Sequence, residues 1–113
     1  MAIYVSNIVI EQGFDFDTSF QLEDTRTKEF LDLTDVIPES KMRKTYSSSN
    51  AVSFASTITS PELGLVQISL TAAQTTAIKP GRYVYDVKLY SGDPVKEYKA
   101  VEGTVLVRAG VTR

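Results

Sequence analysis

Apolar and polar residues alternate with a period of two along most of this chain, and helical periodicity is nearly absent. The clearest case is a stretch whose four large apolar residues share one face: Phe14, Phe16, Phe20 and Leu22. Polar or acidic residues stand between them, so this strand is expected to pack one face inward and to expose the other. The same alternation predicts further strands over residues 3–10 (with a slip near Asn7), 52–58, 66–70, 82–90 and 95–107.

Turn-forming residues separate these strands. The expected turns and loops are at Gly13, Asp24–Glu29, Tyr46–Asn50, Ser60–Gly64 and Ser91–Pro94. Residues 30–34 predict an additional short strand, followed by another over 36–44. Pro38 has no N–H, so the second of these two strands is expected at a sheet edge or bulged at that point.

One short helical crossover is expected near residues 71–78. Thr71 is a suitable N-cap, and Gln74 stands three residues later at the capping-box position. Pro80-Gly81 then stops the helix. The next residues, Gly81-Arg82-Tyr83, have the arrangement of the tyrosine corner of immunoglobulin-like sandwiches, where the phenol bonds back to the backbone. A plain core tyrosine is the alternative interpretation.

The elements together indicate an all-β fold of seven or eight antiparallel strands, about ten residues apart. We expect an immunoglobulin-like β-sandwich in a single domain, residues 1–113, with a small closed barrel as the competing architecture. The core is expected to include one face of each late strand, namely Tyr83, Tyr85, Val87, Leu89, Val101, Val105 and Val107.

Bulk composition restricts the class of partner. The chain has 113 residues, 42% hydrophobic and 23% charged, as expected for one globular domain. Its 12 basic and 14 acidic residues give a net charge of −2, so nucleic acid is not an expected partner. No apolar run approaches the roughly 20 residues of a membrane span, and no secretory signal is visible. We therefore expect synthesis in a cytoplasm without membrane contact.

Cysteine and histidine are both absent. The usual zinc ligands, the usual general base near neutral pH and the usual triad member are therefore missing. We expect a protein that is not an enzyme, and we assign it no catalytic, cofactor-binding or metal-ligating residue and no cofactor. A histidine-free enzyme that uses carboxylates, lysine, tyrosine or serine is kept as a minor hypothesis.

Two sets of polar residues are of types that bind metal ions or act in catalysis in other proteins. The carboxylates Asp15, Asp17, Glu23 and Asp24 have the character of a cation site or an acid–base pair, but alternating charges usually mark the solvated face of a strand. Ser47-Ser48-Ser49 leaves a serine–lysine dyad open. No Gly-x-Ser-x-Gly context accompanies these serines, so an ordinary loop is the expected structure.

Lys41, Arg43 and Lys44 form the only basic cluster of the sequence. They are expected to pair with acidic neighbours and to protect a strand edge, with an anionic partner as the alternative.

Tyr46, Tyr90 and Tyr98 are expected near loops or on outward positions, which favours contacts with other proteins. A glycan site would use Tyr90 with Asp93, or Tyr98 with Glu97. Each tyrosine is equally compatible with a surface position that has no role.

Six segments spread over nearly the whole chain carry a recognisable pattern: Ile8–Gly13, Met42–Lys44, Leu70–Thr75, Pro80–Val87, Val101–Val105 and Gly110–Arg113. With this pattern the chain resembles a family of small virion structural proteins of tailed bacteriophages. The resemblance implies an immunoglobulin-like β-sandwich related to the N-terminal domains of some baseplate and tail-fibre proteins, and it implies no catalytic site. The chain departs from the family at Val36-Ile37-Pro38, where an uninterrupted strand would be expected.

The function that the resemblance implies is a non-enzymatic virion component of the tail or baseplate, or a fibre adaptor. It would contact other virion proteins and copies of itself under the symmetry of the particle. A capsid decoration or neck protein is one alternative, and an adhesin-like glycan-binding module is another. The expected contact elements are the Pro38 strand, the Tyr46–Asn50 loop and the C-terminal tail Ala109–Arg113.

Overall fold

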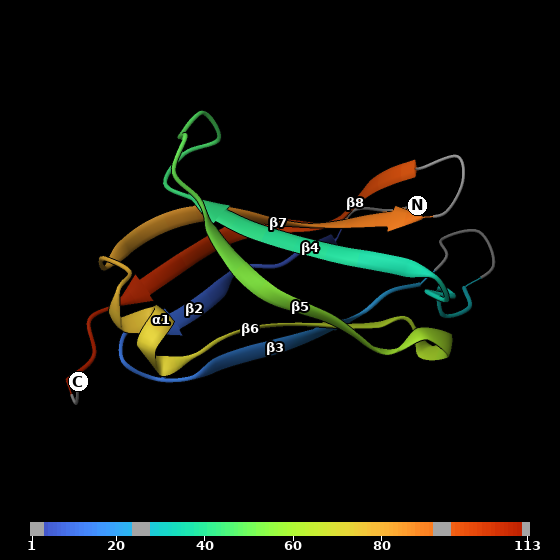
Figure 1. Cartoon of the computed structure of the whole chain (residues 1–113), viewed down its shortest axis with the longest axis horizontal. Coiled ribbons are helices and arrows are strands. Elements are labelled where there is room, and N and C mark those ends of the chain that lie inside the picture. Colours follow the sequence, from blue (N-terminus) through green and yellow to red (C-terminus); the bar gives the residue numbers. More distant parts are fainter. Residues whose placement is uncertain (1–3, 24–27, 92–95, 112–113) are drawn as a thin grey trace.

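The computed structural model describes residues 4–23, 28–91 and 96–111, and this part of the chain is mostly β-strand (Figure 1). The strands are β1 (Tyr4–Val5), β2 (Ile8–Glu11), β3 (Phe16–Gln21), β4 (Val36–Arg43), β5 (Val52–Ser60), β6 (Leu65–Leu70), β7 (Gly81–Ser91) and β8 (Lys96–Arg108). The helices are a 3-10 turn, η1 (Pro61–Leu63), and the short helix α1 (Ala72–Thr76). The all-β prediction is confirmed.

The strands form one curled, mixed sheet in the order β1-β8-β7-β4-β5-β6-β3, with β2 also paired to β8. β1 and β2 run parallel to β8, whereas the other pairs are antiparallel. The prediction of a wholly antiparallel sheet is therefore wrong for the N-terminal segment. Period-two alternation is the same in both kinds of pairing, so it contains no information on strand direction.

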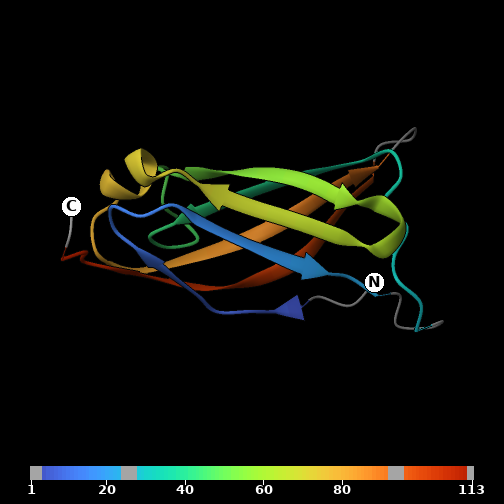
Figure 2. The ribbon, with the colours of Figure 1, turned by 90° about the horizontal axis from the view of Figure 1, so that it is seen from below.

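β5 causes the curl because it changes partners along its length. Its first residues, Val52–Phe54, pair with β4, and from Ala55 onward it pairs with β6. The β5–β6–β3 part thereby folds over the part formed by β4, β7 and β8 (Figure 2). Phe54 lies at the crossing, with its ring 6.2 Å from that of Phe16 and 6.3 Å from that of Tyr85, centroid to centroid.

The core lies between these two parts of the sheet. It contains the predicted inward residues Tyr85, Val87, Leu89, Val101, Val105 and Val107, while Tyr83 is half-buried at its margin. A β-bulge interrupts the alternation on β8: Ala100 is an extra residue between the pairs Val87–Val101 and Lys88–Lys99. Phe14 was expected inside but is 48% exposed, because it precedes β3 and lies in the turn after β2.

Pro38 lies at a sheet edge, as its missing N–H predicts. Residues 36–39 of β4 pair with β7 on one side, whereas the pairing with β5 covers only Ser40–Met42.

The short strand predicted over residues 30–34 is not formed, apart from one isolated bridge between Glu23 and Phe30. Asp32 instead makes a local turn, in which its Oδ1 accepts hydrogen bonds from the N–H and the hydroxyl of Thr34 at 3.0 and 2.6 Å.

The helical crossover and the tyrosine corner are both confirmed. Thr71 Oγ1 accepts a hydrogen bond from the Gln74 N–H (3.2 Å), and Gln74 Oε1 accepts one from the Thr71 N–H (2.8 Å), which completes the capping box. The Tyr83 hydroxyl donates to the carbonyl oxygen of Lys79 at 2.6 Å.

Candidate interaction surfaces

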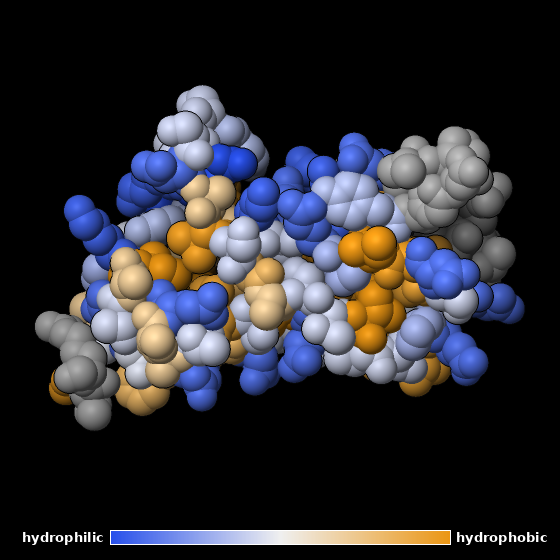
Figure 3. Space-filling view, viewed as in Figure 1, coloured by the Kyte–Doolittle hydropathy of each residue, from blue (hydrophilic) through white to orange (hydrophobic). Residues whose placement is uncertain are grey.

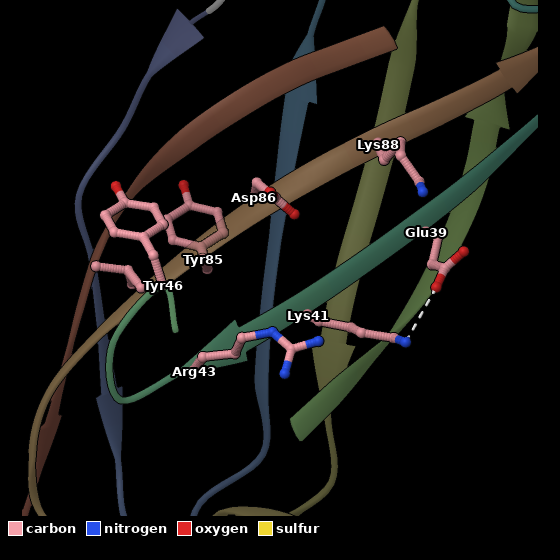
Figure 4. A pocket seen from close by; sticks show the side chains of 8 residues that line it. Glu39, Lys41, Arg43, Tyr46, Tyr85, Asp86 and Lys88 are labelled. Atoms are coloured by element: carbon pink, nitrogen blue, oxygen red, sulfur yellow. Dashed lines mark ion pairs between the residues drawn. The ribbon is translucent and has the colours of Figure 1, made fainter. Parts of the chain in front are cut away.

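The outer face of β4 and β7 has a hollow of about 260 Å³. Glu39, Lys41 and Arg43 extend into it from β4, and Asp86 and Lys88 extend from β7 (Figure 4). The strand register explains this order, because Glu39 lies opposite Lys88 and Lys41 lies opposite Asp86. These four charges therefore face opposite charges on the neighbouring strand, whereas Arg43 lies opposite Val84.

Glu39 is the most strongly engaged carboxylate of this hollow. The Tyr90 hydroxyl donates a hydrogen bond to one of its oxygens, and Lys41 Nζ lies 3.3 Å from the other. These contacts, that with Tyr90 foremost, lower the pKa of the Glu39 carboxyl. Tyr90 also shifts the pKa of Lys88, in this case upward, and Lys88 Nζ lies 4.7 Å from the centre of the Tyr90 ring. Both groups stay charged at neutral pH, so neither is suited to proton transfer there.

The same alternation of charge continues onto β8. Lys88 lies 3.7 Å from Glu97, and Lys99 lies 3.4 Å from Glu102 and 4.0 Å from Asp86. All these side chains are partly exposed, so each pair contributes little to stability. The outer face of this part of the sheet is therefore a polar surface on which opposite charges are already paired.

A larger groove of about 720 Å³ lies at one end of the molecule, between the β4–β5 loop and the crossover that contains α1. The loop contributes polar residues such as Asn50, the crossover contributes Gln74, and the floor includes Met42 and Ile78. Figure 3 shows apolar surface between the β4–β5 loop and α1, bordered by hydrophilic residues.

Three cationic residues line this groove, which we call the basic groove: Arg43, Lys44 and Lys79. Its lining contains no aspartate or glutamate. Lys44 Nζ lies 4.9 Å from the centre of the Tyr83 ring, and Arg43 Nη1 donates to the carbonyl oxygen of Ser48 at 2.8 Å. In the part of the chain that the structure describes, none of the three cations pairs with a carboxylate.

One wall of the basic groove is anchored through Thr75 of α1, which is fully buried. Its hydroxyl donates to the carbonyl oxygen of Phe14 (2.8 Å) and accepts from the N–H of Gly13 (3.1 Å). Gln12 adds a bond from its Nε2 to the carbonyl oxygen of Ile78 (3.1 Å). The turn after β2 thus fixes the crossover in place, a role for Gln12 and Thr75 that the sequence pattern does not reveal.

The predicted basic cluster is divided by the structure. Lys41 pairs with Glu39, as expected, Lys44 lines the basic groove, and Arg43 borders both the groove and the hollow on the outer face of β4 and β7. Lys79 joins them from a distant part of the chain. Sequence reasoning missed Lys79 because it stands next to the Pro80-Gly81 helix stop. Only the folded structure brings Lys79 and Lys44 to the same groove, so no sequence pattern marks them as one site.

The four predicted carboxylates do not form a site. Asp15 Oδ1 accepts a hydrogen bond from the Ala72 N–H at 2.7 Å and so caps the start of α1, while Asp17 is exposed on β3. Glu23 lies beyond the far end of β3, and Asp24 lies outside the described residues. Among the described residues, no three acidic side chains are grouped as metal ligands would be.

The serine loop does not form the dyad that its sequence left open. Ser48 Oγ donates to the carbonyl oxygen of Asn50 (3.3 Å), and Ser47 Oγ lies 3.4 Å from Thr45 Oγ1. Within residues 4–23, 28–91 and 96–111, no serine hydroxyl of this loop is bonded to a lysine amine.

The tyrosines expected on the surface differ in their exposure. Tyr46 is 75% and Tyr98 40% exposed, whereas Tyr90 is partly buried against Glu39. The proposed glycan pair of Tyr98 and Glu97 is not assembled, because Glu97 lies opposite Tyr90 on the outer face whereas Tyr98 lies opposite the buried Leu89. The other pair, Tyr90 with Asp93, involves a residue outside the described ranges.

The C-terminal tail, an expected contact element, has one residue that packs on its own chain, Gly110, whereas Ala109 is exposed. Gly110 is buried so close to the backbone of Gln12 that a Cβ atom would lie 2.1 Å from the Gln12 carbonyl oxygen. Val111 is fully exposed, and the last two residues lie outside the described range.

Comparison with known proteins adds information on the fold alone. No protein-family model and no curated protein matches the chain. The crystal structure of InlP from Listeria monocytogenes is similar over 91% of this chain, at 16% identity and a TM-score of 0.51. A family 123 glycoside hydrolase from Clostridium perfringens is similar over 97% of it, at 12% identity and a TM-score of 0.44.

The chain spans about a quarter of the length of each of these structures, 26% and 24%. The two helices in the described part of the chain are much too short to cross a membrane.

Proposed function

We propose that this protein is a non-enzymatic structural component of a tailed-bacteriophage virion, which acts in the tail or baseplate or at fibre attachment through protein–protein contacts. One observation carries this proposal. The segments that resemble phage virion proteins contribute residues that hold the fold together. Arg43, Lys44 and Tyr83, which also come from these segments, line the basic groove. The resemblance therefore falls on scaffold positions and on one surface groove, as expected for a structural protein that acts through contacts.

The helix and corner segments illustrate this point. Thr71 and Gln74, from the segment Leu70–Thr75, form the reciprocal capping box of α1. Tyr83, from the segment Pro80–Val87, ties the crossover to the start of β7 through the carbonyl of Lys79. Each of these side chains has a bonding partner within its own crossover.

The glycines in the pattern have a comparable role. At Gly103 a Cβ atom would lie 2.1 Å from the carbonyl oxygen of Ser6, and Gly110 has the equally close contact with Gln12. Gly103 lets the N-terminal segment lie close to β8, and Gly110 lets it lie close to the residues that follow β8. A larger residue at either position would force the backbone to shift.

We also propose that the curled sheet is a variant of the immunoglobulin-like sandwich. The tyrosine corner at Tyr83 supports this assignment, as do the two packed parts of the sheet joined through Phe54. The parallel pairing of β1 and β2 with β8 distinguishes it from a purely antiparallel sandwich.

Purified particles of the phage that encodes this chain provide the test. We expect peptides of the protein by mass spectrometry of intact, nuclease-treated particles, and immunogold labelling at the tail or baseplate. Labelling of the capsid or neck would replace this placement by the alternative one. Complete absence of the protein from particles would overturn the proposal, provided that known tail proteins are detected in the same sample.

A further inference from the structure

We infer that the basic groove binds the acidic end of a second copy of this chain. The inference rests on the proposed function, because a virion component meets copies of itself at repeated positions in the particle.

The acidic end consists of residues 28–35 and 60–65, at the opposite end of the molecule from the basic groove (Figure 1). Its two segments are joined by a hydrogen bond from the Leu33 N–H to the carbonyl oxygen of Pro61, at 2.9 Å. One lysine is present, Lys28, and the exposed carboxylates on which the inference depends are those of Asp32, Asp35 and Glu62. This end therefore presents a surplus of negative charge to solvent.

The groove end has the opposite character. Arg43, Lys44 and Lys79 line the groove, and no acidic residue does. Two carboxylates near this end are already engaged: Glu11, the last residue of β2, lies 3.2 Å from Arg108, and Asp15, in the turn after β2, is bonded to the N–H of Ala72. The cations that line the groove and the carboxylates of the acidic end are therefore opposite in sign.

The acidic end of one copy cannot reach the basic groove of the same copy. β4 begins beside the acidic end and ends beside the groove, and the molecule is 44 Å long. At that separation screening by physiological salt removes most of the attraction between the two ends, since the Debye length is about 8 Å. The acidic end of another copy can reach contact distance, where charge complementarity is effective.

Apolar surface accompanies the charges on both sides. Phe30 and Leu63 are each 45% exposed at the acidic end, and the groove has an apolar floor at Ile78 beside the ring of Tyr83. A large aromatic side chain that fills a pocket at the centre of an interface typically contributes much of the binding free energy. Because the two surfaces differ, the contact is head-to-tail and repeats into a ring or a helical stack.

The test measures self-association by sedimentation velocity at low and at high salt. We expect wild-type protein to associate at low salt and to dissociate as salt is added. Lys44→Glu and Lys79→Glu in the groove, and Glu62→Lys at the acidic end, are each expected to weaken association about tenfold or more. Arg82→Glu is the matched control, since Arg82 is exposed beside Tyr83 but does not line the groove. Circular dichroism verifies that each variant is folded.

Mixing two variants tests whether the groove and the acidic end contact each other. An equimolar mixture of Lys44→Glu and Glu62→Lys is expected to regain association, because the intact groove of one variant meets the intact acidic end of the other. The inference is overturned if wild-type protein stays monomeric at the highest soluble concentration, if Arg82→Glu acts as strongly as the groove variants, or if mixing restores nothing. None of these results affects the detection of the protein in particles, so the two proposals fail independently.

Discussion

Asn7 Oδ1 accepts hydrogen bonds from both the backbone N–H and the hydroxyl of Thr104, at 3.1 and 3.0 Å. The register of the N-terminal segment on β8 is the same before and after this point, with Tyr4 opposite Val101 and Ile8 opposite Val105. β1 and β2 therefore pair with β8 in one common register, and the Asn7 side chain supplies a contact to β8 in the gap between the two strands. The slip in alternation near Asn7 in the sequence corresponds to this feature.

Removal of the Asn7 amide leaves the Thr104 N–H without its acceptor. We expect Asn7→Ala to lower the free energy of unfolding by about 1 kcal/mol, as is typical for a lost hydrogen bond. Urea titration followed by circular dichroism measures the change. Ser19→Ala on the exposed face of β3 is the control, expected within about 0.5 kcal/mol of wild type. Equal stability of the two variants would contradict this role of Asn7.

Gly103 lies beneath the same gap between β1 and β2. The Ser6 carbonyl is backbone, so it cannot move away from an added Cβ atom without shifting the N-terminal segment. We expect Gly103→Ala to cost about 1–3 kcal/mol of unfolding free energy, as for overpacking of a tight site. Ser53→Thr, which adds one methyl group at an exposed position of β5, controls for the added volume. An undiminished stability of Gly103→Ala in the same urea titration would show that the segment can yield.

Features with a local cause could be predicted from the sequence. The capping box of Thr71 and Gln74 needs only a spacing of three residues, and the inward face of β7 needs only alternation along one strand. The tyrosine corner at Tyr83 is local as well, since its acceptor is the carbonyl of Lys79. Each of these predictions was right because the feature depends on residues that are close together in the sequence.

Features that depend on which segments meet could not be predicted. Strand direction at β1 and β2 follows from their position beside β8, and the exposure of Phe14 follows from where the chain turns after β2. The basic groove unites Lys44 and Lys79, which are far apart in the sequence and have no shared pattern. Its chemistry appears only when the β4–β5 loop and the α1 crossover are brought together.

Thr75 provides a stringent test of how the groove wall is held. Thr75→Val preserves shape but removes the partner of the Gly13 N–H and of the Phe14 carbonyl, which both lie next to a buried position. We expect a loss of about 1–3 kcal/mol of unfolding free energy. Thr76→Val makes the same exchange at an exposed position of α1 and is expected to change stability by less than about 0.5 kcal/mol. If both variants unfold at the same urea concentration, the buried hydroxyl does not anchor the crossover.

Tyr83→Phe isolates the hydroxyl of the tyrosine corner from the rest of the ring. The ring that Lys44 contacts stays in place, whereas the 2.6 Å bond to the Lys79 carbonyl is lost. We expect a decrease of about 1 kcal/mol in the free energy of unfolding. Tyr46→Phe, at a tyrosine that is 75% exposed, is expected to have no measurable effect. A Tyr83→Phe protein as stable as Tyr46→Phe would rule out a stabilising corner.

Acid sensitivity follows from two carboxylates whose pKa is lowered in the folded protein. The hydroxyl and then the N–H of Thr34 lower the pKa of Asp32, and Tyr90 followed by Lys41 lowers that of Glu39. A folded-state pKa below the unfolded value gives stability that is present above the unfolded value, about 4, and is lost as pH falls through the folded value. We therefore expect the urea midpoint to decrease as the solution is acidified below about pH 4.

Substitution of these carboxylates should remove part of that dependence. Asp32→Asn and Glu39→Gln are each expected to show a smaller decrease of the urea midpoint between about pH 6 and pH 3 than wild type. Asp17→Asn is the control, because the Asp17 side chain is exposed on β3 and makes no hydrogen bond or ion pair within the described residues. A decrease as steep in Asp32→Asn and Glu39→Gln as in Asp17→Asn would place the acid-sensitive groups elsewhere in the protein.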